Sequence, residues 1–303
     1  MSSPGLAHLK QALSGNKQPL QDYAFTTSDG LKLAYSITGS GPLVVVQTPG
    51  WGIGKGYLER FLAPLTENFT LLSFLPRGTL PSGRPANESA MSSADMSEDL
   101  EALRLHLDQD KLTLFGHSNG SSITQAYASK YPLRVNKLML VCSQLIGFND
   151  SATFQKFAQA RAEDPRYANA LASFPKAFAA QTDDEFRAAL VDLMPFYFAH
   201  PEKHSKTWQD MIAASVIQVW PFMAQHKADN NNNQQAMQEL AKIQAKTLII
   251  VGDQDAFCTV RTSEQIHAGI GGSKLVVLND CGHFPWNECK DEFFNEALKF
   301  LEE

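Results

Sequence analysis

The feature that most constrains the fold is a repeated alternation of short apolar runs with segments of helical periodicity. Residues 43–46 and 71–75 are almost wholly apolar, as in strands that are buried on both faces of a sheet. Between them Tyr57, Phe61 and Leu65 recur every four residues, as on the buried face of a helix. A strand, a helix and a second strand in this order predict a βαβ unit with two parallel strands.

The same alternation continues along most of the chain. Further helices are expected at residues 96–107, 120–130, 263–270 and 291–301, and further strands at 111–115, 137–141, 247–251 and 274–278. Ser97 is the expected N-cap of the first of these helices. Two earlier strands, at 23–27 and 31–38, flank a turn signal at 28–30. The pattern predicts an α/β fold with a mostly parallel sheet and helices on both faces.

The alternation is interrupted once, by residues 145–235, where helical spacing and many aromatic residues replace the strand pattern. We expect this segment to form a helical cap, inserted into a core domain made of residues 22–144 and 236–303. A cap over a sheet edge has an underside that faces the substrate, and the candidates for lining a pocket there are Phe196, Tyr197, Phe198, Trp220 and Phe222. Residues 229–235, which include four consecutive asparagines, are expected to form a solvated loop.

The strongest motif for chemistry is G-H-S-N-G at residues 116–120, between the strand at 111–115 and the helix that follows. In this context it matches the G-x-S-x-G nucleophile elbow, which holds a serine at a strained strand-to-helix turn. Small residues are needed on both sides, because a Cβ at either glycine would crowd the turn or the adjacent helix. Ser118 is therefore the expected nucleophile.

A serine needs a base to activate it, and the base needs a carboxylate to orient it. Asp255 follows the strand at 247–251, which brings its carboxylate to the carboxyl edge of the sheet, where open α/β folds build their sites. Asp253 is an alternative acid that could instead order the loop. His283, in a Gly-His-Phe-Pro segment after the last strand, is the expected base.

These three motifs, in the order Ser, Asp and His, resemble those of the α/β-hydrolase superfamily from about residue 22 to 301. Within it the chain is similar to the capped branch of proline iminopeptidases and esterases, because the loop at 76–85 contains Arg77-Gly78 with Gly and Ser following. The resemblance implies an eight-stranded, mostly parallel sheet with an inserted helical cap. A structural role is expected for Arg77.

The resemblance also implies an oxyanion hole with two backbone N–H donors. The first belongs to the residue after the nucleophile, Asn119. The second comes from the loop after the strand at 43–46, where the family usually has His-Gly and this chain has Thr48-Pro49. Proline has no N–H, so Gly50 is the first candidate and Trp51 the second.

Composition limits the other functions. The net charge is −6 and the chain has no dense run of Lys and Arg, which argues against nucleic-acid binding. We find no signal peptide and no apolar run of membrane-spanning length, and four cysteines without C-x-x-C spacing suggest reduced thiols. A soluble, cytoplasmic protein is expected. No metal or dinucleotide motif is present, so we expect no cofactor and a small-molecule substrate; the oligomeric state stays open.

The leading functional hypothesis is hydrolysis of an ester, lactone or thioester with an apolar or aromatic body, through an acyl-enzyme on Ser118. One alternative is a proline iminopeptidase-like aminopeptidase, which would need acidic cap residues to bind a free amine. Another is a carbon-carbon bond hydrolase of secondary metabolism. Outside enzymes, the same scaffold could serve as a ligand receptor with negligible turnover.

Overall fold

The computed structural model of the chain describes residues 3–231 and 233–303, apart from the side chains of residues 233–235. Its centre is a sheet whose eight strands have the order β1-β2-β4-β3-β5-β6-β7-β8. β1 pairs with β2, and β2 with β4, in antiparallel fashion, and all other neighbours are parallel. The strands are Gln18–Thr26, Lys32–Gly39, Leu43–Gln47, Thr70–Leu75, Leu112–His117, Val135–Val141, Lys246–Gly252 and Lys274–Leu278. The expected α/β-hydrolase fold, with eight strands, is confirmed.

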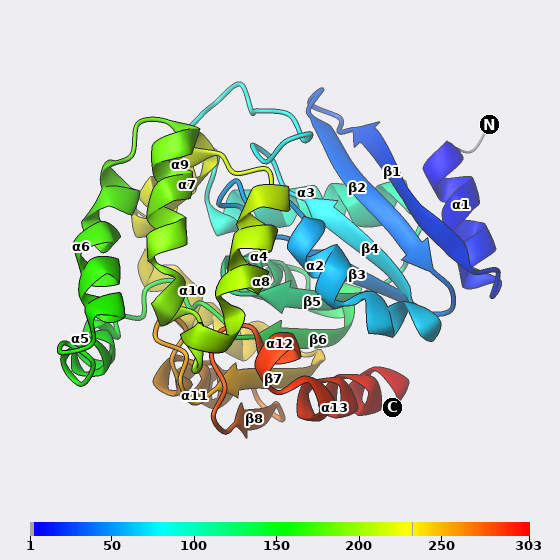
Figure 1. Ribbon diagram of the computed structural model, residues 1–303. Coiled ribbons are helices and arrows are strands. Elements are labelled where there is room, and N and C mark those ends of the chain that lie inside the picture. The colour runs from blue at the N-terminus through cyan, green and yellow to red at the C-terminus, as the bar shows by residue number, and fades with distance from the viewer. Residues whose placement is uncertain (1–2, 232) are drawn as a thin grey trace.

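Helices cover both faces of this sheet (Figure 1). On one face, apolar side chains of α1, α3, α4 and α11 form one core with the sheet, and on the other α2 and α13 join a second core that extends into the cap. These helices are Pro4–Leu13, Ser93–His106, Asn119–Lys130, Val260–Gly269, Gly56–Phe61 and Lys290–Glu302. β4 is buried along its whole length, as expected for a strand covered on both sides.

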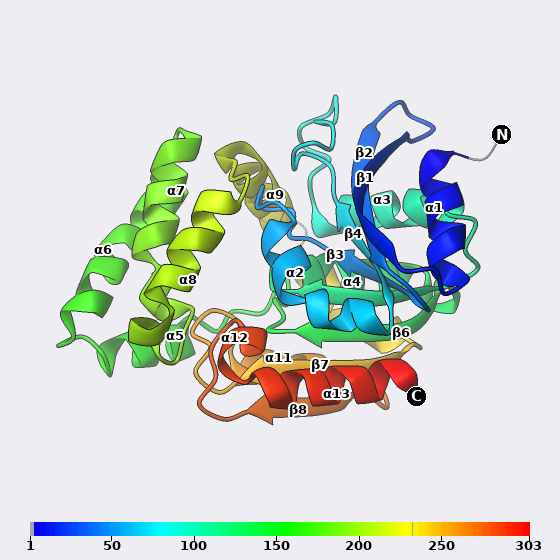
Figure 2. The same cartoon turned by 45° about the vertical axis from the view of Figure 1, so that its right-hand side comes forward.

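A group of helices stands over the carboxyl ends of the parallel strands (Figure 2). It is built from α5, α6, α7, the short helix η3, α8 and α9, with bounds Ser151–Gln159, Pro165–Ala179, Asp183–Asp192, Met194–Phe196, Pro201–Ala214 and Val219–Asn231. α10 (Asn233–Glu239) and η4 (Leu240–Lys242) lead back to β7. Because parallel strands of one sheet end on the same side, every loop between a core strand and its following helix opens toward these helices.

Two local expectations were wrong. α3 begins four residues before Ser97, because Ser92 caps it: the Ser92 hydroxyl accepts the N–H of Asp95 and the Asp95 carboxylate accepts the N–H of Ser92. Residues 229–231 belong to α9 and residues 233–235 to α10, where a solvated loop was expected. Asp229 is only 7% exposed, so the asparagine-rich segment begins on a helix that packs against the core.

Arg77 has the structural role expected for it. Its guanidinium forms a bidentate ion pair with the carboxylate of Asp99 on α3, with Nε 2.9 Å from Oδ2 and Nη2 2.7 Å from Oδ1. Asp99 is 1% exposed, and its Oδ2 also accepts the backbone N–H of Arg77. The pair fixes the loop after β4 against α3.

Candidate active site

Ser118 lies at a strained turn between β5 and α4. Its backbone torsion angles, φ 53° and ψ −124°, are ones that a residue with a Cβ rarely adopts. A Cβ at Gly116 would lie 2.6 Å from the Cα of Ser121, and a Cβ at Gly120 would collide with the carbonyl of Gln47. The two glycines therefore allow the sharp turn that holds Ser118 at the end of the strand.

Asp255 and His283 form a hydrogen-bonded pair. His283 Nδ1 lies 2.7 Å from Asp255 Oδ2, and the two residues are only 2% and 4% exposed, respectively. The other oxygen, Asp255 Oδ1, accepts the backbone N–H groups of Phe257 at 3.0 Å and Cys258 at 2.9 Å. A carboxylate held in this way accepts the Nδ1 proton and leaves Nε2 of His283 free to take a proton.

Asp253, the alternative acid, lies elsewhere in the same loop. It is exposed, and its Oδ1 accepts the N–H of Cys281 at 3.2 Å. Asp253 therefore orders the segment that leads to His283. Of the two aspartates, Asp255 is the one whose carboxylate bonds to the imidazole.

Ser118 and His283 line the same two cavities, and Cys258 lines one of them. Within the described residues, the hydroxyl of Ser118 has no hydrogen bond to the imidazole; such bonds are often long in free enzymes and shorten when substrate binds. Burial and the nearby Asp255 carboxylate raise the pKa of Cys258 well above its ordinary value, although the Ser118 hydroxyl lowers it slightly. The thiol is therefore uncharged near neutral pH, and Ser118 remains the candidate nucleophile.

His117, the variable residue of the elbow motif, stands behind the base. Its Nε2 lies 2.9 Å from the carbonyl oxygen of His283 and its Nδ1 lies 3.0 Å from the hydroxyl of Tyr57. A carbonyl can only accept, so Nε2 carries the hydrogen and Nδ1 accepts from Tyr57. Burial lowers the pKa of His117 well below its ordinary value, with a smaller effect from His283. A neutral imidazole thus joins α2, β5 and the loop of the base.

The expected oxyanion loop is tied to the elbow by a side chain. The N–H of Gly50 donates to Asn119 Oδ1 at 2.9 Å, and Asn119 Nδ2 donates to Gln144 Oε1 at 3.0 Å. The Gly50 amide is therefore already engaged. Trp51, the second candidate, lines both cavities, and Asn119 is the first residue of α4, where a backbone N–H has no partner within the helix.

The loop that carries His283 is fastened to the cap at two points. The N–H of His283 donates to the carbonyl of Tyr197 at 2.8 Å. The N–H of Gly282 donates to Glu288 Oε2 at 2.7 Å, and Glu288 Oε1 accepts the N–H of His200 at 3.1 Å. The Glu288 side chain is 2% exposed. The position of the base therefore depends on cap residues as well as on the sheet.

Two cavities meet at Ser118 and His283. One has a volume of about 50 Å³ and the other about 230 Å³. The residues that line both are Trp51, Ser118, Leu190, Tyr197 and His283. Among the described residues, neither lining includes an Asp, Glu, Lys or Arg side chain. The site thus offers a serine and an imidazole in surroundings that are mainly apolar and, within the described part of the chain, contain no Asp, Glu, Lys or Arg side chain.

A family comparison fits this geometry. The model of the α/β hydrolase fold matches residues 43–286 of the chain. The chain belongs to the α/β-hydrolase fold family. The match runs from β3, through the elbow and the acid, to three residues beyond His283.

Individual α/β hydrolases are similar to this chain along nearly its full length. It is 23% identical to a proline iminopeptidase of Pestalotiopsis fici, over 92% of this chain and 99% of that protein. It is 26% identical to lipase 3 of a Moraxella species, over 94% of this chain and 86% of that protein. Among solved structures, an esterase from Exiguobacterium antarcticum superposes with a TM-score of 0.70 at 20% identity, covering 92% of this chain and 99% of that one.

The five aromatic residues expected at the pocket of this hydrolase have different surroundings. Tyr197 lines both cavities, and Phe222 lines the larger one. Phe196 is fully buried among other rings of the cap, and Phe198 stacks on an imidazole of α8. Trp220 packs with its ring 3.7 Å from the guanidinium carbon of an arginine outside the cap. The structure thus brings two of the five to the cavities that Ser118 and His283 line.

Several cavity residues were missed by the sequence analysis. Leu190 on α7 lines both cavities, and Met211 and Ile212 on α8 line the smaller one. Nothing in the sequence distinguishes these apolar residues from the rest of the cap core. Phe257 and Cys258 line the larger cavity, and here a signal existed, because they lie two and three residues after Asp255 in the same loop.

Possible metal ligands also meet in this hydrolase. They form two groups of three: His117, Cys142 and His283, and Asp255, Cys258 and His283. In each group the possible ligand atoms lie within 4.8 Å of one another. Both nitrogens of His117 and Nδ1 of His283 are already engaged in hydrogen bonds. Burial raises the pKa of both thiols, which disfavours the thiolates that metals bind. In the structure His117, Asp255 and His283 take part in hydrogen bonds to one another and to neighbouring groups, and the Cys142 thiol donates to the carbonyl of Gly282.

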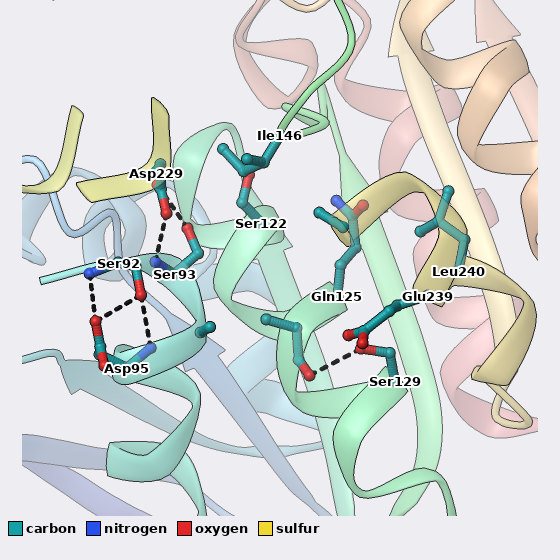
Figure 3. Close-up of a pocket in the computed structure, with 13 residues that line it drawn as sticks. Ser92, Ser93, Asp95, Ser122, Gln125, Ser129, Ile146, Asp229, Glu239 and Leu240 are labelled. Atoms are coloured by element: carbon teal, nitrogen blue, oxygen red, sulfur yellow. Dashed lines mark hydrogen bonds between the residues drawn. The ribbon is translucent and has the colours of Figure 1, made fainter. Parts of the chain in front are cut away.

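A further cavity, of about 270 Å³, lies between α3, α4 and the returning helices α9 and α10 (Figure 3). Its lining is polar and includes Asp229, whose carboxylate accepts the N–H of Ser93 at 2.7 Å and the Ser93 hydroxyl at 2.9 Å. Ser93 Oγ also accepts a hydrogen bond from Gln225 Nε2 at 3.2 Å.

None of the helices in the described residues is long and apolar enough to cross a membrane.

Proposed function

We propose that this protein is a serine hydrolase that cleaves a neutral carboxylic ester, lactone or thioester with an apolar or aromatic body. The observation that carries the proposal is the buried pair of His283 Nδ1 and Asp255 Oδ2, 2.7 Å apart, at the cavities that Ser118 also lines. A nucleophile, a base and an orienting carboxylate in this order are the parts of acyl transfer through a covalent intermediate.

In the proposed reaction, Ser118 Oγ forms a bond to the substrate carbonyl carbon while its proton passes to His283 Nε2. The tetrahedral intermediate collapses when the bond to the leaving oxygen or sulfur breaks, and that atom takes the proton from Nε2. Water then attacks the acyl-enzyme, gives a proton to Nε2 and releases the acid, and the proton returns to Ser118. Asp255 stabilises the imidazolium and remains ionised.

The developing oxyanion is assigned to the backbone N–H groups of Asn119 and Trp51. Gly50 is the less suitable second donor, because its N–H already donates to the side chain of Asn119. That bond holds the loop after β3 against the elbow, which favours a fixed position of the Trp51 amide. Fixed donors stabilise the transition state without reorganising during the reaction.

The proposed neutrality of the substrate rests on the cavity linings. An aminopeptidase must bind a free ammonium group, but the acidic cap residues that could do so are elsewhere: Asp183 accepts the N–H of Val219, and Glu185 caps its own helix. Among the described residues, no carboxylate lines either cavity. Ester hydrolysis is therefore preferred over the activity named for the fungal iminopeptidase.

A fluorophosphonate probe tests the nucleophile. We expect one label per chain, at Ser118, and no label on Ser118→Ala. Labelling at another residue, or none on folded protein, would remove the serine-hydrolase proposal.

Turnover separates an enzyme from a ligand receptor on the same scaffold. With p-nitrophenyl acetate and butyrate, the wild-type protein is expected to exceed Ser118→Ala by orders of magnitude over many turnovers. Release of p-nitrophenol that stops at one equivalent per chain would favour a receptor instead.

A further inference from the structure

We infer that the substrate is strongly asymmetric, with a group of only two or three non-hydrogen atoms on one side of the ester bond and an aromatic group on the other. This inference rests on the proposed function. It concerns the shape of the site on the two sides of Ser118, which the triad alone does not determine.

The first argument is volume. A cavity of about 150 Å³ lined by apolar side chains is large enough to bind benzene, and one water takes up about 30 Å³ of liquid. The cavity of about 230 Å³ therefore has room for a phenyl ring and a short linker, whereas the cavity of about 50 Å³ has none for a ring.

The second argument is the position of the cavities. Ser118 and His283 line both, so a carbonyl carbon at the Ser118 hydroxyl has one cavity on each side. Trp51, Leu190 and Tyr197 also line both cavities. An ester has two substituents at its reacting centre, and each must enter a different cavity.

The third argument is the chemistry of the walls. The larger cavity is lined by rings, including Phe174, Phe178, Phe186, Phe222 and Phe257, which suit an aromatic guest. Its polar groups are neutral: Gln144 is an amide, and burial lowers the pKa of His226. The smaller cavity is closed by side chains of α8, among them Trp208, Met211 and Ile212, which are 3%, 7% and 5% exposed. Close packing around these residues resists expansion.

Four esters test the inference. Benzyl acetate and methyl phenylacetate are isomers that carry the ring on the alcohol and on the acyl side, respectively. Benzyl phenylacetate carries a ring on both sides, and methyl acetate carries none. We expect the better of the two isomers to exceed benzyl phenylacetate in kcat/KM by at least about tenfold, per active site titrated with fluorophosphonate. Whichever isomer is better assigns the larger cavity to that side.

Variants test whether the cavities set this ratio. Ile212→Ala enlarges the smaller cavity and should reduce the advantage of the better isomer over benzyl phenylacetate at least about threefold. Ala177→Leu narrows the larger cavity and should slow the better isomer more than methyl acetate. Trp220→Ala is the matched control, because Trp220 lines neither cavity, and should leave both ratios unchanged.

The outcomes are distinguishable. Equal or faster cleavage of benzyl phenylacetate by labelled, active enzyme overturns the asymmetry but leaves the serine-hydrolase proposal intact. The asymmetry is also overturned by two results together. The better isomer keeps its full advantage over benzyl phenylacetate in Ile212→Ala, and Ala177→Leu slows methyl acetate as much as the better isomer. If no ester is cleaved faster than by Ser118→Ala, the proposed function fails and the inference fails with it.

Discussion

Asp229 makes stability depend on pH in a direction opposite to that of most carboxylates. It lies on α9 at the polar cavity, is 7% exposed, and has hydrogen bonds from Ser93 (Figure 3). Burial raises its pKa from an ordinary 3.8 to about 6, although the bonds from Ser93 lower it and Asp95 adds a smaller increase. The folded protein therefore holds this proton more tightly than the unfolded chain does.

The sign and size of the effect follow from linkage. Below pH 3.8 Asp229 is protonated in both states. Between pH 3.8 and about 6 the unfolded chain releases the proton first, so the contribution of Asp229 to the free energy of unfolding falls as pH rises and then levels off. A difference of slightly more than two pKa units, at about 1.36 kcal/mol per unit, corresponds to about 3 kcal/mol.

Asp229→Asn removes the titration and keeps an oxygen that can accept the N–H of Ser93. Urea unfolding at pH 4, 5, 6 and 7, followed by tryptophan fluorescence, gives the free energy of unfolding of each protein. Relative to wild type, the variant should become more stable by about 2 kcal/mol between pH 4 and pH 7, because at pH 4 the unfolded chain has already lost part of this proton. The exposed Glu163→Gln is the control for loss of one negative charge. A difference between Asp229→Asn and wild type that is constant over the four pH values, or that changes in the opposite direction, would refute the reasoning.

Three further predictions concern the triad, its support and the loop after β4. Asp255→Asn should lower kcat by about 10⁴ because it favours the wrong tautomer of the base, whereas Asp253→Asn should keep most activity; the reverse order in folded variants contradicts the assignment. His117→Leu should lower kcat by about 10- to 100-fold with little change in KM. His117→Gln should retain more of the wild-type kcat, because its amide can still donate to the carbonyl of His283; equal kinetics of the two variants would count against a positioning role for His117. Asp99→Ala should lower the free energy of unfolding in urea by about 3 to 5 kcal/mol, because Arg77 is left as a buried, unpaired charge; a loss below 1 kcal/mol would contradict this.

The placement of Ser118, Asp255 and His283 at one edge of the sheet could be predicted from the sequence, because these residues occur where the fold leaves little choice. Ser118, Asp255 and His283 each follow a core strand, and parallel strands deliver the residues after them to one edge of the sheet. The strands could be predicted as well, because short apolar runs bounded by turn residues are typical of buried strands.

Positions that depend on three-dimensional neighbours were harder to predict. Ser97 is the N-cap expected from the helical pattern at 96–107, yet a capping box at Ser92 starts the helix earlier. Gly50 is the first candidate donor once Pro49, which has no N–H, is excluded, and nothing local signals that the side chain of Asn119, distant in sequence, engages its amide. In the cap, aromatic residues that face the cavity and those that face the cap interior share one helical pattern, so Trp220 could not be separated from Tyr197.

Tyr197 has two roles, one for its side chain and one for its main chain. Its ring lines both cavities, whereas its main-chain carbonyl holds the backbone of His283. A carbonyl is present whatever side chain is attached, so position 197 can exchange its ring for another side chain while the anchor of the base persists. Selectivity at this position can therefore diverge between related enzymes without a matching change in the catalytic apparatus.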